Sequence, residues 1–203
     1  MEEIRACLDN DGEISSRERR LLDRLRKSLG ITEARAKELE TSVNNMSDDE
    51  IEYAVKNYSK LYSQKGKEMF TVYDGIYDAL RDLKKNGFKL AIATQKHRMF
   101  TTDMLENYDA ADVFDAVCAT DVGTNLTKSH LLLQACEQTG VSVEESVLVG
   151  DGTIEANGAE EIGMDFLAVL YGWGFRTKEE TEKYKCSGTV AAPAEIVPRV
   201  LAL

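Results

Sequence analysis

The sequence predicts an α/β protein whose core is a parallel, Rossmann-like sheet, preceded by a small N-terminal helical segment and cap. From Phe88 onward, short apolar runs alternate with stretches of helical periodicity. Strands that alternate with helices indicate a parallel sheet with right-handed crossovers. The expected strands are Phe88–Ala93, Phe114–Ala119, Val147–Val149 and Phe166–Leu170, and the expected helices lie around residues 100–108, 129–139 and 154–162. The fingerprint GxGxxG is absent from the sequence, which disfavours a dinucleotide site.

Residues 1–43 form the first expected domain, a helical segment. Leucines recur at helical spacing from Leu21 to Leu29, before Gly30, a residue type that commonly ends helices. The polar stretch Asp9–Glu13 separates this helix from an earlier one. It partly matches a calcium-binding EF-hand loop, but Cys7 stands where the first ligand is expected. A polar turn between two helices is the favoured interpretation, and a degenerate calcium loop stays open.

Residues 44–87 form the second expected domain, a helical cap remnant followed by a linker helix. The capping box Ser47–Glu50 precedes an apolar stripe from Ile51 to Tyr62, which predicts an amphipathic helix. A second helix is expected between Gly75 and Gly87. Residues 88–203 are the expected α/β core.

Composition limits the possible partners. The 203 residues carry a formal net charge of −11 and a pI near 4.8, which argues against nucleic acid or an anionic membrane as a partner. No apolar run reaches the length of a membrane span, and the N-terminus lacks the features of a signal peptide. The four cysteines form no CxxC pair, as expected of reduced thiols. A cytoplasmic protein is expected, and its oligomeric state is left open.

Chemically active side chains follow successive apolar runs. Asp151 comes after Val147–Val149, and Glu155 lies four residues further on, so the pair is suited to Mg²⁺. Thr94 follows the first run and Lys128 follows the second. Because the carboxyl ends of parallel strands meet at one edge, this hydroxyl, ammonium and carboxylate pair suit a bound phosphoryl group. Taken singly, Asp151 and Thr94 could each be a helix cap, and Lys128 a surface lysine.

Four segments in this order resemble haloacid dehalogenase (HAD) superfamily hydrolases, and most closely their phosphoglycolate phosphatase-type branch. They are YAVKNYSKLYSQKG, YDGIYDALRDLKKNGFKLAIATQK with Thr94, TKSHLLLQA with Lys128, and VLVGDGTIEANGAEEIGMDFLAVLYGWG with Asp151. The resemblance extends from about Asn44 to the C-terminus. It implies Mg²⁺-dependent hydrolysis of a small phosphorylated substrate. Glu155 departs from the pattern, because this branch usually has Asp at that position.

The first motif of that family supplies its nucleophile. The one stretch with comparable spacing here is Asp9-Asn10-Asp11-Gly12-Glu13. The resemblance makes Asp9 the nucleophile and Asp11 the general acid/base, and it adds both carboxylates to the candidate metal ligands.

Two structures for this first stretch stay open. The preceding Glu3–Leu8 contains Arg5, which is unfavourable in a buried central strand. The same region resembles helical tellurite-resistance-type domains, in which a DGxIxxxE turn joins two helices. A helix is therefore favoured. The family's fold argues for a strand, because its first-motif strand lies between those that carry Thr94 and Asp151, and omitting it leaves backbone groups unpaired.

Three functions follow from these observations. The leading hypothesis is a Mg²⁺-dependent phosphomonoester hydrolase of the HAD type that acts on a small phosphorylated metabolite, as a phosphoglycolate phosphatase does. The alternative is a catalytically impaired HAD-like protein that lacks a proper first motif and acts as a binding module through its N-terminal helices. The third is a calcium-responsive module, which Cys7 disfavours.

Overall fold

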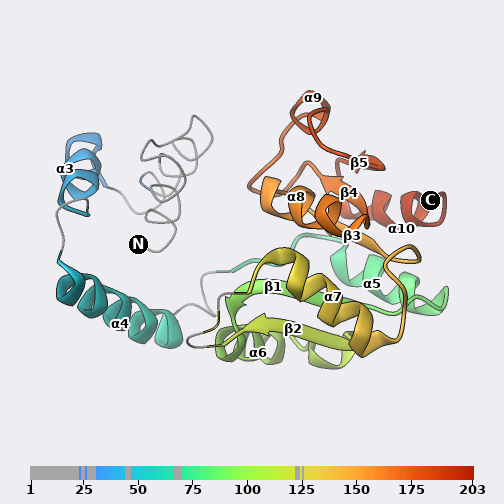
Figure 1. Cartoon of the computed structure of the whole chain (residues 1–203), viewed down its shortest axis with the longest axis horizontal. Helices are drawn as coiled ribbons and strands as arrows, with labels where there is room; N and C mark the ends of the chain where they lie inside the picture. Colours follow the sequence, from blue (N-terminus) through green and yellow to red (C-terminus); the bar gives the residue numbers. More distant parts are fainter. Residues whose placement is uncertain are drawn as a thin grey trace. The chain divides into compact units, whose positions relative to one another are not determined.

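The structure is a computed structural model that describes residues 23, 26, 31–43, 47–65, 70–121, 124 and 126–203. The chain divides into two compact units, Met1–Met69 and Phe70–Leu203 (Figure 1). The predicted Asp9–Glu13 turn lies outside the described residues. Within the described part of the chain, no helix is long and apolar enough to span a lipid bilayer.

The described part of the first unit contains the helices α3 (Glu33–Val43) and α4 (Asp48–Lys65). The amide of Glu50 donates to Oγ of Ser47 at 3.4 Å, and the amide of Ser47 donates to Oε2 of Glu50 at 2.9 Å. This reciprocal pair satisfies amide groups that the first turn of a helix leaves unpaired. The predicted capping box and the helix that follows it are confirmed.

The second unit contains two parallel sheets flanked by helices. In the first, β1 (Ala91–His97) pairs with β2 (Ala116–Thr120); in the second, the order is β3 (Val147–Gly150), β4 (Asp165–Val169) and β5 (Gly188–Val190). The longer helices are α5 (Ile76–Lys85), α6 (Arg98–Asn107), α7 (Lys128–Thr139) and α8 (Thr153–Ile162), and the short ones are η2 (Ala111–Val113), α9 (Lys178–Thr181), η3 (Pro193–Glu195) and α10 (Ile196–Val200).

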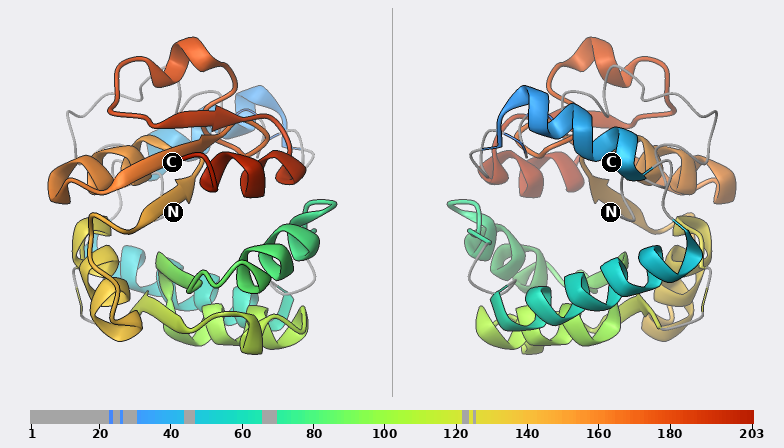
Figure 2. Two further views of the ribbon diagram at one scale, coloured as in Figure 1. Left: turned by 90° about the vertical axis from the view of Figure 1, so that its right-hand side faces the viewer. Right: turned by 90° about the vertical axis from the view of Figure 1, so that its left-hand side faces the viewer.

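The predicted α/β class and parallel pairing are confirmed, with two differences. β5 was not predicted, because its three residues are too few to show a periodicity. The expected single sheet is replaced by two groups of strands, since no described strand joins β1 to β3. Figures 1 and 2 both show the β1–β2 pair and the β3–β4–β5 group as separate pieces.

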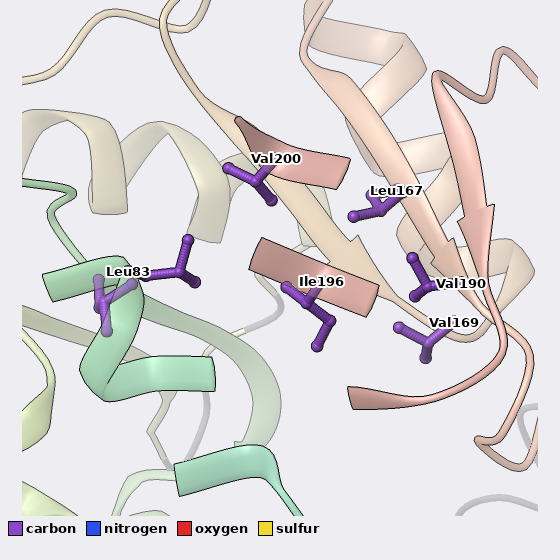
Figure 3. Close-up of a cluster of buried hydrophobic side chains, with 7 residues drawn as sticks. Leu83, Leu167, Val169, Val190, Ile196 and Val200 are labelled. Carbon is purple, nitrogen blue, oxygen red and sulfur yellow. The ribbon is translucent and has the colours of Figure 1, made fainter. Parts of the chain in front are cut away.

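Side chains of β4 alternate between two apolar clusters. Leu167 and Val169 enter one cluster, whereas Phe166 and Ala168 enter the other. Figure 3 shows the first cluster gathered between α5, α10 and the strands; its buried members are Leu83, Leu90, Leu167, Val169, Val190, Ile196 and Val200. The second cluster includes residues of α7 and α8. Because successive strand residues point to opposite faces, helices cover both faces of this sheet.

The guanidinium of Arg98 covers carbonyl groups along β2. Its Nη1 donates to the carbonyl oxygen of Val117 at 3.3 Å, and its Nη2 donates to that of Ala119 at 3.1 Å. An ion pair with Asp121, 3.0 Å long, holds the side chain there. Arg98 therefore satisfies acceptors that a strand at the edge of a sheet would otherwise leave open.

Asp115 connects α5 to the beginning of both strands of the first sheet. Its carboxylate accepts hydrogen bonds from Nζ of Lys84 at 2.8 Å and from the amide of Leu90 at 2.7 Å. The Lys84 hydrogen bond and, second, the Leu90 amide lower the pKa of Asp115. A carboxyl group whose pKa is lower in the folded than in the unfolded chain stabilises the fold. This contribution is complete at pH values above the pKa of the unfolded chain.

We expect the free energy of unfolding of Asp115→Asn to fall less steeply at acid pH than that of the parent. The contribution of Asp115 is complete above the ordinary aspartate pKa of about 3.9 and disappears as pH falls through the lowered folded value. Urea unfolding between neutral and acid pH should show the parent losing more stability below about pH 4 than the variant. The exposed Asp103→Asn on α6 is the control, and parallel profiles for the parent and Asp115→Asn would contradict the expectation.

Candidate functional site

Thr94 lies near the carboxyl end of β1, opposite Ala119 of β2. The register between the two strands shifts between Thr94 and His97, so regular pairing ends at Thr94. The hydroxyl oxygen of Thr94 accepts a hydrogen bond from the amide of Lys96 at 3.1 Å. Ligands of open α/β sheets bind at the carboxyl ends of strands, so Thr94 has the position expected of a ligand-binding hydroxyl.

Lys128 is the first residue of α7 and is buried, with its side chain only 9% exposed. Its Nζ donates to the carbonyl oxygen of Ala93 in β1 at 2.9 Å and forms an ion pair with Oε1 of Glu155 in α8 at 3.1 Å. The surface position considered for this lysine is therefore wrong. Lys128 connects β1 to the helix that follows β3.

Gly158 of α8 makes this burial possible. A Cβ atom at this position would lie 2.5 Å from Cγ and 2.7 Å from Cβ of Lys128, well inside van der Waals contact. Only glycine lets α8 approach the stem of Lys128 this closely. The N-terminus of α7 is fixed as well, because the Oγ1 of Thr127 accepts from the amide of His130 in a capping box.

Asp151 follows β3 and is held by backbone amides. Its Oδ2 accepts hydrogen bonds from the amides of Trp173, at 2.6 Å, and Gly174, at 2.9 Å. The amide of Phe175 donates to the backbone carbonyl oxygen of Asp151 at 2.6 Å. The N-cap of α8 is Gly152, without a side-chain cap bond, so the alternative that Asp151 merely caps this helix is wrong.

Gly172 lies against the side chain of Asp151. A Cβ atom on Gly172 would lie 2.3 Å from Cβ and 2.4 Å from Oδ2 of Asp151. Sequence reasoning missed the amides of Trp173 and Gly174 as well as this contact, because backbone donors leave no side-chain signal. The one available hint was the pair of glycines in the segment YGWG after the last predicted strand.

Tyr171 precedes Gly172 in the chain and is partly buried. Its ring meets that of Tyr73 edge-on, with centroids 5.0 Å apart. Burial, the neighbouring Tyr73 and the charge of Asp151 all raise the pKa of the Tyr171 hydroxyl. The phenol therefore stays neutral beside Asp151 at physiological pH.

Glu155 lies in the first turn of α8, where its Oε1 contacts Lys128. A Cβ on Gly150 would lie 2.6 Å from its Cγ, so the end of β3 and the stem of Glu155 are in close contact. The structure thus brings Lys128 and Glu155 together beside the strand that leads to Asp151. Asp9 and Asp11 lie outside the described residues.

Two carboxylates of this region have the chemistry of ligands for a divalent cation. Asp151 and Glu155 supply hard carboxylate oxygens, and the described residues contain no group of three or more His, Cys, Asp or Glu that could hold a metal. Mg²⁺ commonly uses one or two carboxylates together with water and phosphate oxygens. The residues therefore fit Mg²⁺ shared with a phosphorylated ligand better than a cation held by the protein alone.

Several proteins of known sequence are similar to this chain. The chain is similar to phosphoglycolate phosphatase from Psychrobacter arcticus, with 27% identity over 138 residues that cover 68% of this chain and 60% of the relative. Pyrophosphatase PpaX from Bacillus cereus is 25% identical over 162 residues, which cover 79% of this chain and 74% of the relative. The chain spans less than two thirds of the length of several curated relatives it matches.

A solved structure shares the fold. The crystal structure of a predicted phosphatase from Clostridium acetobutylicum superposes with a TM-score of 0.73 at 25% identity and covers 87% of both chains. The haloacid dehalogenase-like hydrolase family matches residues 21–169, a range that includes Thr94, Lys128, Asp151 and Glu155 and begins after Asp11. The N-terminal tellurite-resistance-type resemblance stays a prediction. Because the match covers most of the 203 residues, the chain belongs to the haloacid dehalogenase-like hydrolase family.

Proposed function

We propose that the chain is a Mg²⁺-dependent phosphomonoester hydrolase that acts on a small phosphorylated metabolite. The observation that carries the proposal is the buried ammonium of Lys128, which contacts the end of β1 and pairs with Glu155. A buried cation at the carboxyl ends of strands is suited to an anionic ligand. The phosphatase relatives support the same class of reaction.

Lys128 and Thr94 are the proposed phosphate-binding residues. The Thr94 hydroxyl donates to a phosphoryl oxygen, and the Lys128 ammonium offsets the charge that develops on phosphoryl oxygens during transfer. Burial strengthens this electrostatic interaction, because the effective dielectric constant is lower away from water. The ion pair with Glu155 and the Ala93 carbonyl keep the ammonium in position before the substrate binds.

Asp151 and Glu155 are the proposed metal ligands. The amides of Trp173 and Gly174 engage Oδ2 of Asp151, and Lys128 engages Oε1 of Glu155. We propose that the other oxygen of each carboxylate faces the cation. When bound, Mg²⁺ would neutralise charge on the phosphoryl group and polarise it.

The nucleophile is the part of the site that the described residues do not supply. Asp9, with Asp11 as its acid/base partner, is the candidate that the sequence offers. Both precede residue 21, where the family match begins. This observation favours a second candidate function, a HAD-like module that binds phosphate and Mg²⁺ but carries no nucleophile in its own N-terminal segment.

Titration with inorganic phosphate, with and without Mg²⁺, tests the proposed function. We expect Mg²⁺ to strengthen phosphate binding to the parent chain. Asp151→Asn should weaken that effect about tenfold or more, because a site with two carboxylates loses one of its charges. The measurement is isothermal titration calorimetry of both proteins.

Asp112→Asn provides the matched control, because Asp112 is an exposed carboxylate in η2. It should retain the full effect of Mg²⁺. The proposal fails if the parent binds no phosphate, or if Asp151→Asn responds to Mg²⁺ as the parent does.

A further inference from the structure

Two large apolar side chains are exposed next to Asp151. Trp173 is 61% exposed and Ile154 is 57% exposed. The amide of Trp173 donates to Oδ2 of Asp151 at 2.6 Å, and Ile154 lies in the first turn of α8, three residues after Asp151. We call Trp173 and Ile154 the apolar rim. Tryptophan is highly buried on average, so the exposure of this one beside a candidate site indicates a use other than packing.

The other aromatic residues of the same loop are used for packing. The ring of Tyr171 meets that of Tyr73, with centroids 5.0 Å apart. Phe175 is 3% exposed, and its ring lies 5.4 Å from that of Tyr184. Within the described part of the chain, no aromatic ring lies against the indole of Trp173. The loop therefore packs two of its three aromatic rings and leaves the third exposed.

The backbone of this loop fixes the place of the indole. Gly172 has no room for a Cβ atom, which would lie 2.3 Å from Cβ of Asp151. The amide of Gly174 donates to Oδ2 of Asp151 at 2.9 Å, and the amide of Phe175 donates to its backbone carbonyl oxygen at 2.6 Å. A side chain on a restrained backbone loses less conformational freedom when a ligand binds, so the indole is prepared for binding.

Charge limits what the apolar rim can accept. Neither of its side chains carries a charge, and the chain as a whole has a formal net charge of −11. A ligand with a second anionic group would be repelled by this net charge and would find no partner on the rim. A neutral group meets neither penalty.

We propose that the apolar rim binds the organic part of the substrate, and that this part is a neutral, flat aromatic ring joined closely to the phosphate. The indole of Trp173 stacks on the ring, and Ile154 adds apolar contact area. Ligand sites commonly combine apolar and aromatic walls with a few polar groups, which Asp151 and its neighbours supply here. The inference rests on the proposed function and adds to it a specificity-determining residue, Trp173.

Calorimetric titration of the full 203-residue chain with phenylphosphonate and methylphosphonate, in the presence of Mg²⁺, tests the proposal. Hydrolysis of phosphomonoesters does not cleave the C–P bond of these probes, so the titration measures binding alone. We expect the parent to bind phenylphosphonate about tenfold or more tightly than methylphosphonate, because only the phenyl ring can stack on the indole.

Variants of the apolar rim identify the side chain responsible. Trp173→Ala should lose most of the preference for phenylphosphonate, and Trp173→Phe should keep most of it, because phenylalanine retains a flat ring. Both variants keep the backbone amide and should bind inorganic phosphate as the parent does, since phosphate has no organic part. Leu201→Ala is the matched control, because Leu201 is 56% exposed at the C-cap of α10. It should keep the full preference.

Fluorescence gives a second measurement, because Trp173 is the only tryptophan of the chain. Acrylamide should quench its emission in the free chain. Saturating phenylphosphonate should lower the quenching constant, because the ring covers the indole. Methylphosphonate should leave it unchanged.

The outcomes separate this inference from the proposed function. Phosphate binding without a preference for phenylphosphonate, or a preference that Trp173→Ala retains, overturns the inference alone. An indole that acrylamide does not reach in the free chain overturns it as well, because the apolar rim is then covered. Absence of any binding of inorganic phosphate overturns the proposed function and this inference with it.

Discussion

Gly172→Ala is expected to abolish the Mg²⁺-dependent part of phosphate binding. The added Cβ would lie 2.3 Å from Cβ of Asp151 and 2.4 Å from its Oδ2, so the carboxylate must move. Movement breaks its hydrogen bonds with the amides of Trp173 and Gly174. Overpacking of this kind costs roughly 1–3 kcal/mol of stability. Calorimetric titration with phosphate and Mg²⁺ and urea unfolding measure the two effects.

Trp173→Ala is the control for Gly172→Ala, because it changes the same loop without adding an atom against Asp151. Trp173 holds Asp151 through its backbone amide, and its side chain is 61% exposed. The variant keeps the amide and should bind Mg²⁺ and phosphate as the parent does. Normal binding by Gly172→Ala would show that the position of Asp151 does not control the site.

Lys128→Met is expected to lower phosphate affinity about 100-fold. The substitution preserves length and apolar packing against Gly158 but removes the buried ammonium. Loss of one preorganised electrostatic donor in a catalytic site typically costs 10²- to 10³-fold in rate. Fluorescence or calorimetric titration with inorganic phosphate measures the change in affinity. Any phosphatase activity of the parent should fall by at least a similar factor.

Lys85→Met is the matched control, because the side chain of Lys85 is 66% exposed and pairs with Asp82 one helical turn away. It should bind phosphate normally. The double variant Lys128→Met with Glu155→Gln removes both partners of the ion pair. It should regain stability relative to Lys128→Met without regaining phosphate affinity, because no uncompensated carboxylate remains. Full affinity in Lys128→Met would exclude this residue from the phosphate site.

Local patterns in the sequence account for much of the fold. The alternation of apolar runs with helical stretches predicted four of the five strands that the structure describes in the second unit, and Ser47–Glu50 predicted the start of α4. These signals are local, because each depends on side chains within a few residues. The separation of β1 from β3 is not local. It depends on how segments far apart in the sequence pair, and periodicity within any single run carries no such information.

In the candidate site too, local patterns predicted the residues, whereas contacts with distant segments could not be predicted. Asp151 and Lys128 were recognised because each follows an apolar run, but their surroundings were not. The burial of Lys128 depends on Gly158, thirty residues further along the chain, and the orientation of Asp151 depends on amides near Gly172. Glycines that permit close approach have no side chain to reveal the contact. Asp9 and Asp11 remain sequence predictions, because they lie outside the described residues.

The guanidinium of Arg98 has a consequence for how the chain associates. Its hydrogen bonds to Val117 and Ala119 block carbonyl groups of β2, and the far strand of the other sheet, β5, is only three residues long. Short or blocked outer strands resist edge-to-edge polymerisation. Growth of either sheet into fibres by edge-to-edge pairing should therefore be hindered at β2 and at β5.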